Sequence, residues 1–433
     1  MKVERKVTFS TLGCRLNQYE TQAIREQFKR SGYVETPDSK QADVFVLNTC
    51  TVTGESDKES RYLIRKFHRS NPTGKIVVTG CYVERDREAI EAMEGVTLTV
   101  LNREKSELLE MFESCTSLSF RQFEPPSKRR LAPLSISRFE GRTRACIKIQ
   151  DGCNHACSFC KVVLARGPSR SRPFHEIVDE AKRLSDQGYL EVVLTGIQLG
   201  AYGYDLEKRQ MLPELLGALS QIPGLKRIRL SSIEPTDVTE ELVDAMAQFQ
   251  HVCRHLHIPL QSGDDEVLKR MNRRYRRNVY RRLIQHLNER LDDFILTADV
   301  MVGFPGETNE AFRHTVELLE DARPYKLHIF PYSVREGTKA ARFQDSVPRE
   351  LIVKRRALLQ DLERKWADEH RRRFVGKTLD VLVEENETSG EWLSGRTGNY
   401  IKVHFWSRSP KIEPICRVRV EGIKERKLVG SLC

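Results

Sequence analysis

Six short apolar runs, separated by segments of helical composition, occupy the middle of this 433-residue chain. They are Cys146–Ile149, Val192–Leu194, Ile228–Leu230, Leu256–Leu260, Ile295–Val302 and Leu327–Phe330. Strands that alternate with helices are typical of a parallel sheet. Six units with glycine-rich carboxyl ends fit a partial barrel better than a closed eightfold barrel. The pattern therefore predicts an α/β fold in which residues 139–370 form a partial (βα)6 barrel.

Three cysteines near the N-terminus each follow an apolar run. The runs Val7–Leu12, Val44–Leu47 and Ile76–Val78 precede Cys14, Cys50 and Cys81, respectively. These cysteines are 36 and then 31 residues apart, about the length of one strand, helix and return in a βα repeat. The carboxyl ends of parallel strands lie at one edge of a sheet, where ligands bind. We therefore expect a parallel α/β domain over residues 3–118, with the three cysteines at one edge.

The C-terminal part of the chain has a different pattern. Residues 119–138 contain three prolines and a basic cluster, which is typical of a linker. A long charged helix is expected over Arg349–Arg373. In Thr378–Glu384 and Cys416–Glu421, apolar residues alternate with polar ones, which predicts half-buried strands. With turn glycines between these strands, residues 372–433 are expected to form a small antiparallel β-barrel.

The composition narrows the class of protein. Lys and Arg total 72 against 61 Asp and Glu, and the resulting net charge of +11 favours a polyanion as partner. No apolar run approaches the roughly 18 residues of a membrane-spanning helix, and the first residues lack the apolar stretch of a secretory signal. The expected compartment is the cytoplasm, without a membrane partner. Eleven cysteines in such a chain indicate metal ligation or thiol chemistry more than disulfides.

The sharpest motif is a CxxxCxxC loop after the first strand of the predicted barrel, formed by Cys153, Cys157 and Cys160. Three thiolates can ligate three irons of a 4Fe-4S cluster and leave the fourth iron open. The amino and carboxylate groups of S-adenosylmethionine can chelate an open iron, beside a cluster that supplies an electron. The alternative is a structural zinc site completed by His155, but the usual second pair of ligands is missing downstream.

Seven segments together resemble the methylthiotransferases among the radical S-adenosylmethionine enzymes. They are TLGCRLNQYET, LNTCTVT, VVTGCYVE, DGCNHACSFC, ARGPSRSRP, IPLQSGDDEVLKRMNR and VGFPGET. The resemblance spans the whole chain and implies an N-terminal methylthiotransferase domain, a radical core and a C-terminal TRAM domain. It also implies a second 4Fe-4S cluster on Cys14, Cys50 and Cys81, which holds the sulfur to be inserted, and S-adenosylmethionine as cofactor.

The resemblance further implies an acceptor. The CRLNQYE form after the first strand looks like the branch that converts N6-threonylcarbamoyladenosine beside the tRNA anticodon to its 2-methylthio derivative. The alternatives are the branch that acts on isopentenyladenosine, usually with CQMN, and the branch that acts on ribosomal protein S12, usually with CPKN. A further hypothesis is a non-catalytic iron-sulfur RNA-binding protein. Expected partners are the tRNA anticodon stem-loop, a sulfur donor and an electron donor such as flavodoxin or ferredoxin.

Weaker signals indicate cofactor and RNA contacts. By resemblance, Phe159 lies beside the adenine of S-adenosylmethionine. Further cofactor contacts are expected at the strand ends, from Thr195, Gly196, Gln198, Gln261, Gly303 and Gly306, although each glycine could simply make a tight turn. In the C-terminal barrel, Phe405 and Trp406 are expected to stack on RNA, beside Arg396, Lys402 and Arg408.

Overall fold

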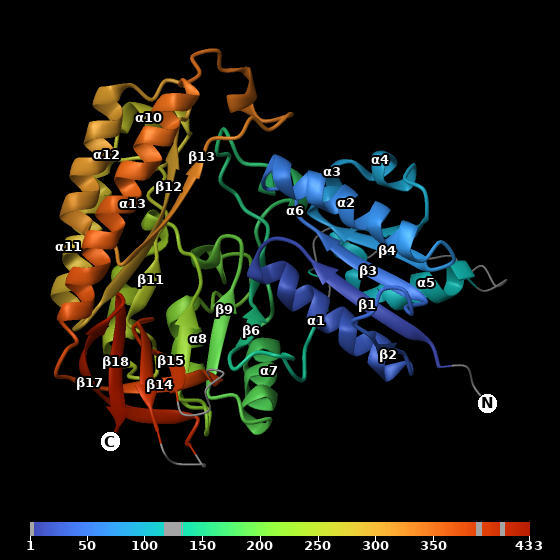
Figure 1. Ribbon diagram of the computed structural model, residues 1–433, viewed down its shortest axis with the longest axis horizontal. Coiled ribbons are helices and arrows are strands. Elements are labelled where there is room, and N and C mark those ends of the chain that lie inside the picture. The colour runs from blue at the N-terminus through green and yellow to red at the C-terminus, as the bar shows by residue number, and fades with distance from the viewer. Residues whose placement is uncertain (1–3, 117–130, 132, 387–391, 408–411) are drawn as a thin grey trace.

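The computed structural model describes residues 4–116, 131, 133–386, 392–407 and 412–433. It contains an N-terminal sheet, a central half-open barrel and a small C-terminal barrel (Figure 1). The order of these three units is the one that the sequence predicts. Their exact boundaries remain predictions, and residues 119–130 and 132 of the predicted linker lie outside the described part of the chain.

The N-terminal unit is a parallel sheet with the strand order β2-β1-β3-β4-β5. Its strands are β1 (Lys6–Thr11), β2 (Val34–Glu35), β3 (Val44–Thr49), β4 (Lys75–Gly80) and β5 (Val96–Val100). Helices α1 (Arg15–Arg30), α2 (Gly54–Ser70) and α5 (Leu108–Thr116) pack around it. Every residue of the central strand β3 is buried, because apolar side chains cover both faces of the sheet. The predicted parallel α/β domain is confirmed.

The central unit contains all six predicted strands, in two parallel three-stranded sheets. One sheet has the order β10 (Arg227–Leu230), β9 (Glu191–Thr195), β6 (Ala145–Lys148), and the other β11 (His255–His257), β12 (Ile295–Val302), β13 (Lys326–Pro331). A parallel bridge between Ser232 and His257 connects the two sheets. The outer helices are α7 (Phe174–Asp186), α8 (Leu212–Ser220), α9 (Glu240–Gln248), α11 (Arg277–Arg290), α12 (Asn309–Ala322) and α13 (Arg349–Arg372). The partial barrel is therefore confirmed.

The C-terminal unit is a closed barrel with the order β14-β15-β16-β18-β17. The strands are β14 (Thr378–Asn386), β15 (Trp392–Thr397), β16 (Lys402–Trp406), β17 (Ile415–Lys424) and β18 (Lys427–Leu432). Its pairs are antiparallel except β16 with β18, which is parallel. Five strands that alternate in direction cannot close a ring without one parallel pair. The expected barrel is present, with this one departure from an antiparallel arrangement.

The end of the predicted linker is part of the protein core. Leu134 and Ile136 are buried in the apolar core of the central unit, beside Tyr19 of α1. The Tyr19 hydroxyl donates a hydrogen bond of 2.9 Å to the Leu134 carbonyl. This segment therefore packs between the N-terminal and central units. No helix of the described residues is both long and apolar enough to cross a membrane.

Candidate functional site

The three N-terminal cysteines lie where the sequence predicts, at the carboxyl edge of the sheet. Cys14 precedes α1, Cys50 follows β3, and Cys81 begins the short helix α3 (Cys81–Arg85) after β4. Cys14 is exposed, whereas Cys50 and Cys81 are buried. Burial raises the pKa of the Cys50 thiol, and the neighbouring Cys81 and Cys14 raise it further. Their position at one edge is confirmed, and their role as ligands stays a prediction.

Two glycines allow this close approach. Gly13 has φ of +89°, and a Cβ there would lie 2.7 Å from the Cys50 sulfur. Gly80 has φ of +103°, and its Cβ would lie 2.3 Å from the Thr49 carbonyl oxygen. Both the backbone conformation and the spacing exclude larger residues. These glycines let the loops that carry the cysteines come together.

The second triad lies in a loop between β7 (Gln150–Asp151) and helix α6 (Val162–Arg166). Each of its sulfurs accepts a hydrogen bond. The backbone NH of His155 donates to Cys153 Sγ at 3.3 Å, and that of Val162 donates to Cys160 Sγ at 3.4 Å. The Arg273 guanidinium donates to Cys157 Sγ at 3.3 Å. Such donors stabilise thiolates and tune iron-sulfur clusters.

The chemistry of these three thiols fits a metal cluster. Burial raises the pKa of Cys153 to about 11 and that of Cys160 to about 12, and the neighbouring Cys157 raises both. Three thiolates in this loop therefore require a cation that they share. The donor set fits a 4Fe-4S cluster held by three cysteines.

The structure does not favour His155 as a zinc ligand. The Gln198 side-chain amide donates to His155 Nε2 at 2.8 Å, and the Gln198 amide oxygen accepts from the backbone of Asn154 at 3.1 Å. The imidazole is thereby held as an acceptor within the loop. Gln198, predicted to contact the cofactor, thus positions the cysteine loop. Its backbone NH also donates to Gln150 Oε1 at 2.9 Å.

The other predicted cofactor residues differ in their surroundings. Gly303 and Gly306 have φ of +75° and +85° and make tight turns, in contact with Ile352 and Asp345, respectively. Phe159 packs edge-on against Phe304, with ring centroids 6.3 Å apart. Gln261 is 8% exposed, and its buried side-chain oxygen has no hydrogen-bond partner in the described structure. Contact of these residues with S-adenosylmethionine remains a prediction.

Thr195 and Gly196 line a cavity of about 230 Å³ inside the partial barrel. Further lining residues are Cys14, Arg15, Leu16, Ile197, Leu230, Ser231, Ser232, His255, His257, Thr297, Lys326, His328 and Tyr400. The cavity therefore connects the Cys14 edge of the N-terminal unit with the strands of the partial barrel. Sequence reasoning missed its histidines, although the HLH spacing on β11 predicts that both rings share one face of the strand.

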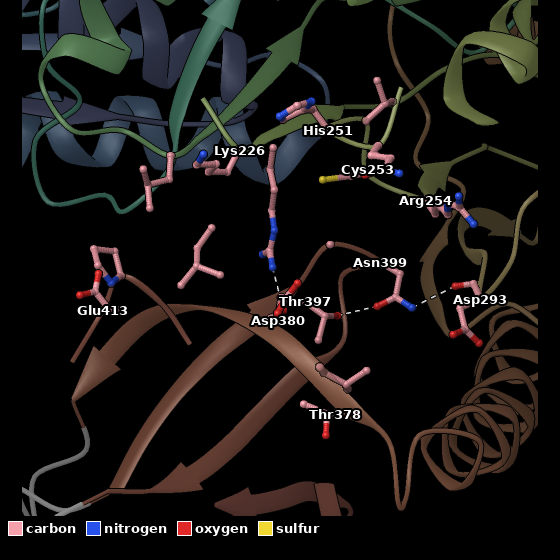
Figure 2. A pocket seen from close by; sticks show the side chains of 18 of the residues that line it. Lys226, His251, Cys253, Arg254, Asp293, Thr378, Asp380, Thr397, Asn399 and Glu413 are labelled. Atoms are coloured by element: carbon pink, nitrogen blue, oxygen red, sulfur yellow. Dashed lines mark hydrogen bonds between the residues drawn. The ribbon is translucent and has the colours of Figure 1, made fainter. Parts of the chain in front are cut away.

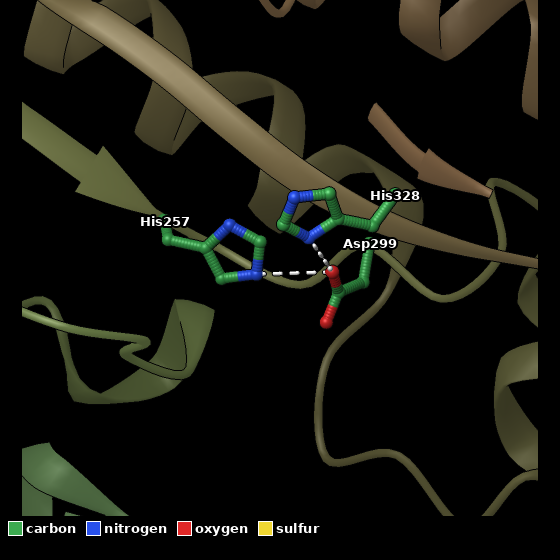
Figure 3. Close-up of side chains that lie close together, drawn as sticks. All are labelled: His257, Asp299 and His328. Carbon is green, nitrogen blue, oxygen red and sulfur yellow. Dashed lines mark hydrogen bonds and ion pairs between the residues drawn. The ribbon is translucent and has the colours of Figure 1, made fainter. Parts of the chain in front are cut away.

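Three side chains from adjacent strands meet at this wall (Figure 3). His257 Nε2 and His328 Nδ1 lie 3.0 Å and 3.1 Å from the same oxygen, Asp299 Oδ1. Burial raises the pKa of the Asp299 carboxyl, but the two hydrogen bonds outweigh burial and hold it well below its usual range. Their ligand atoms lie within 4.8 Å of one another, which is compatible with a metal ion. The hydrogen bonds also satisfy the carboxylate without one.

A buried cluster of charges joins the two cysteine-bearing units. Glu20 lies 2.5 Å from Lys105, 2.7 Å from Lys148 and 3.0 Å from Arg166. Arg166 and Lys148 also contact Asp151, at 3.0 Å and 2.7 Å. All five side chains are buried, and together they carry one more positive than negative charge. This charge cluster places a net positive charge beside the first triad.

The excess charge acts on the first triad. Burial raises the pKa of the Cys81 thiol, whereas the Arg166 and Lys105 cations lower it. A positive charge beside Cys81 stabilises a thiolate ligand and the negative charge of a cluster.

A larger cavity of about 1010 Å³ separates the C-terminal barrel from the partial barrel (Figure 2). Lys226 and His251 lie on one side, and Asp380 and Thr397 on the other (Figure 2). Asn399 donates to the Asp293 carbonyl oxygen at 2.9 Å across this interface. None of the six cysteines lines the cavity. This cavity therefore lies at the interface between the two barrels and is not part of either cysteine triad's site.

Of the two residues predicted to stack on RNA, Phe405 is placed wrongly by the prediction. Phe405 is completely buried in the core of the C-terminal barrel, whereas Trp406 is partly exposed. Adjacent residues of a strand point to opposite faces, so both rings cannot face the solvent. Arg408, expected beside them, lies outside the described residues. Arg396 packs its guanidinium over the Tyr400 ring, 4.4 Å from the centroid.

Comparison with known proteins agrees with these units. Residues 147–319 match the radical SAM superfamily, and residues 6–101 match a model described as uncharacterized protein family UPF0004. TsrM from Kitasatospora setae, a radical S-adenosylmethionine methyltransferase, has a TM-score of 0.57 at 17% identity, over 76% of this chain and 72% of that chain. This likeness shows the shared fold.

Full-length relatives identify the family. The threonylcarbamoyladenosine tRNA methylthiotransferase MtaB of Bacillus subtilis (strain 168) is 39% identical, over 96% of this chain and 93% of the relative. The protein of that name from Chlamydia pneumoniae is 38% identical, over 97% and 96%. A tRNA-2-methylthio-N(6)-dimethylallyladenosine synthase from Acetivibrio thermocellus is 31% identical, over 98% and 90%. This chain belongs to the methylthiotransferase family of radical S-adenosylmethionine enzymes.

Proposed function

We propose that this enzyme converts N6-threonylcarbamoyladenosine beside the tRNA anticodon to its 2-methylthio derivative. The observation that carries the proposal is the cavity inside the partial barrel, because Cys14 lines it together with Thr195 and Gly196 of the radical core. The relatives named for this acceptor are 35–39% identical to the chain, against 31% for the dimethylallyladenosine synthase from Acetivibrio thermocellus.

The two cysteine triads have different proposed roles. Cys153, Cys157 and Cys160 hold the 4Fe-4S cluster that, when bound, supplies the electron for cleavage of S-adenosylmethionine. Cys14, Cys50 and Cys81 hold a second 4Fe-4S cluster, which carries the sulfur. The shared edge of the first triad and the positive charge beside Cys81 support this second assignment.

The protein contributes fixed geometry. An aromatic C–H is not acidic enough for any side chain to deprotonate it, so a radical route is needed. The carbon must therefore lie within reach of the cluster sites of both cysteine triads. The charge cluster around Glu20 holds the Cys14 helix against the Cys153 loop. The main contribution of the charge cluster is to fix the position of one triad relative to the other.

The C-terminal barrel is the proposed site of tRNA binding. Arg417 and Arg419 of β17 alternate with buried residues and are exposed on the outside of the barrel. Among the described residues, no carboxylate lies within ion-pair distance of either guanidinium. Two unpaired cations on a barrel of a chain with net charge +11 are suited to phosphates. The proposed compartment is the cytoplasm, with a sulfur donor and an electron donor such as flavodoxin or ferredoxin.

Mass spectrometry of tRNA nucleosides from cells with and without the gene tests the acceptor. We expect 2-methylthio-N6-threonylcarbamoyladenosine to disappear and its precursor to accumulate. Loss of only the isopentenyladenosine derivative would contradict the proposal and assign the other tRNA branch. If no nucleoside changes, the proposal also fails, and ribosomal protein S12 becomes the acceptor to examine.

A further inference from the structure

Arg15 is a cation that lines the cavity inside the partial barrel, called the central cavity below. Its side chain is partly buried, and it lines the cavity next to Cys14. Among the described residues, no carboxylate lies within ion-pair distance of its guanidinium. The other permanent cation in the lining is Lys326, which pairs with Glu363 at 2.6 Å. Arg15 is therefore the permanent cation of this wall that is available to a ligand.

The positive charge of Arg15 lowers the pKa values of two other residues that line the cavity. Burial lowers the pKa of His255, and Arg229, His257 and Arg15 lower it further. Burial raises the pKa of Tyr400, but the surrounding arginines, Arg15 included, outweigh burial and lower it. These effects require a positive potential inside the cavity, and an anionic ligand would offset it.

The neighbouring arginines already have partners in the protein. Arg229 donates to Glu191 at 2.7 Å, and Arg144 pairs with Glu384 at 2.8 Å. Arg396 lies 3.4 Å from Glu384. Arg15 alone among these four lacks such a pair in the described structure. Arg15 is therefore the arginine of this group whose charge remains available to a ligand.

Unsatisfied polar atoms accompany this cation. His255 is 4% exposed, and its Nδ1 atom is buried with no hydrogen-bond partner in the described structure. Its Nε2 atom lies 3.1 Å from the Thr297 hydroxyl. The Ser231 hydroxyl lines the same cavity and is likewise buried without a partner there. Buried polar groups normally have partners, so these atoms indicate a polar ligand.

We propose that Arg15 binds the carboxylate of the N6-threonylcarbamoyl group and thereby sets the preference for this acceptor. The inference rests on the proposed function and adds the group that recognises the substrate. A threonylcarbamoyl group carries one carboxylate, one hydroxyl and amide groups, which match a guanidinium and the unpaired atoms of His255 and Ser231. A dimethylallyl group is apolar and would leave the Arg15 cation unpaired and desolvated.

The test pairs one substitution with one change of substrate. Anticodon stem-loops carry either N6-threonylcarbamoyladenosine or its methylamide, which lacks the negative charge. For the wild-type enzyme, we expect kcat/KM to fall at least tenfold on the methylamide. Arg15→Gln should show a similar fall on the natural substrate and little further loss on the methylamide. Arg15→Lys should restore part of the activity on the natural substrate only.

Two controls separate recognition from damage. Arg25→Gln changes an arginine on the same helix that pairs with Glu35 outside the cavity, and it should leave the substrate preference unchanged. Iron content and S-adenosylmethionine cleavage without RNA should be the same in Arg15→Gln as in the wild type. Unchanged iron content would show that the neighbouring Cys14 still functions as a ligand, and unchanged cleavage would show that the second triad is intact.

The possible failures are distinguishable. Equal wild-type turnover of the two stem-loops would overturn the inference, because the carboxylate would not be recognised. An equal fold loss in Arg15→Gln on both stem-loops would overturn it as well, since Arg15 would then act on structure alone. If the wild type forms no methylthio product on the natural stem-loop, the proposed function itself fails, and the inference fails with it.

Discussion

The Glu20 carboxylate and the Arg166 guanidinium lie 3.0 Å apart, although 146 residues separate them in the chain. Glu20 belongs to the helix that begins after Cys14, and Arg166 ends the helix that begins after Cys160. Both side chains are almost completely buried. This ion pair therefore links the two cysteine triads mechanically, and it cannot adjust by moving into solvent.

Replacing Glu20 by Gln should destabilise the protein strongly. The substitution leaves Lys105, Lys148 and Arg166 buried with only Asp151 as counter-charge. Breaking a buried ion pair on one side costs about 3–5 kcal/mol. We expect a large fall in the urea midpoint. Iron should also be lost from the first triad, because the helix that follows Cys14 is no longer held by Lys148 and Arg166.

Glu369→Gln is the matched control for this experiment. Glu369 pairs with Arg323 at 3.3 Å on the protein surface, where such pairs contribute about 0–1 kcal/mol. Its urea midpoint should stay close to that of the wild type. Equal midpoints for both variants would show that the charge cluster around Glu20 does not stabilise the protein.

The two cysteine triads should give separable phenotypes. Cys157→Ala removes a sulfur from the loop that ends at α6, so S-adenosylmethionine cleavage under dithionite should be lost. Cys50→Ala should leave cleavage intact and stop sulfur insertion into RNA. Reconstituted wild-type protein should hold about eight irons, and each variant about four. Identical phenotypes would argue against two clusters with separate roles.

The exposed arginines of β17 should contribute to tRNA affinity through charge. In the double variant Arg417→Ala/Arg419→Ala, tRNA should bind more weakly, and the slope of log K against log salt should decrease by about 1 to 2. S-adenosylmethionine cleavage should be unchanged, because neither residue lines the central cavity. Arg313→Ala, which changes an exposed arginine on α12, serves as control. An unchanged salt slope would exclude this face of the barrel.

Point substitutions are preferable to deletion of the C-terminal barrel. Arg229 donates to the carbonyl of Gly398 at 3.0 Å, and Tyr400 stacks on His255 with ring centroids 4.5 Å apart. Deletion beyond Gly376 would expose these buried groups and open the central cavity. A loss of S-adenosylmethionine cleavage in such a truncation would then reflect damage to the core as well as loss of RNA contacts.

His255 should make stability depend on pH below neutrality. Burial and the neighbouring cations hold its pKa well below the ordinary value of 6.5. The unfolded chain therefore binds a proton that the folded protein does not, and stability falls as the pH drops below about 6.5. Between pH 7.5 and 5.5, the wild type should lose more stability than His255→Asn, by about 1 kcal/mol. Urea unfolding at both pH values measures this, and equal losses would contradict it.

Local patterns in the sequence predicted most of the fold. The six strands of the partial barrel, the three strands that precede Cys14, Cys50 and Cys81, and the closed C-terminal barrel all follow from periodicity and turn residues. Periodicity did not separate the two faces of β16. The prediction that both Phe405 and Trp406 face the solvent is therefore wrong for Phe405. A strand buries alternate residues, and which set is buried depends on what packs against it.

The sequence by itself determined the chemistry of this protein, because cysteine spacing and the order of strands are properties of neighbouring residues. Only the tertiary structure decided which distant side chains share a site. Arg15 comes from the N-terminal unit, His255 from the partial barrel and Tyr400 from the C-terminal barrel, yet all three line one cavity. These three residues share a cavity because the three units pack together, and no local pattern in the sequence predicts that packing.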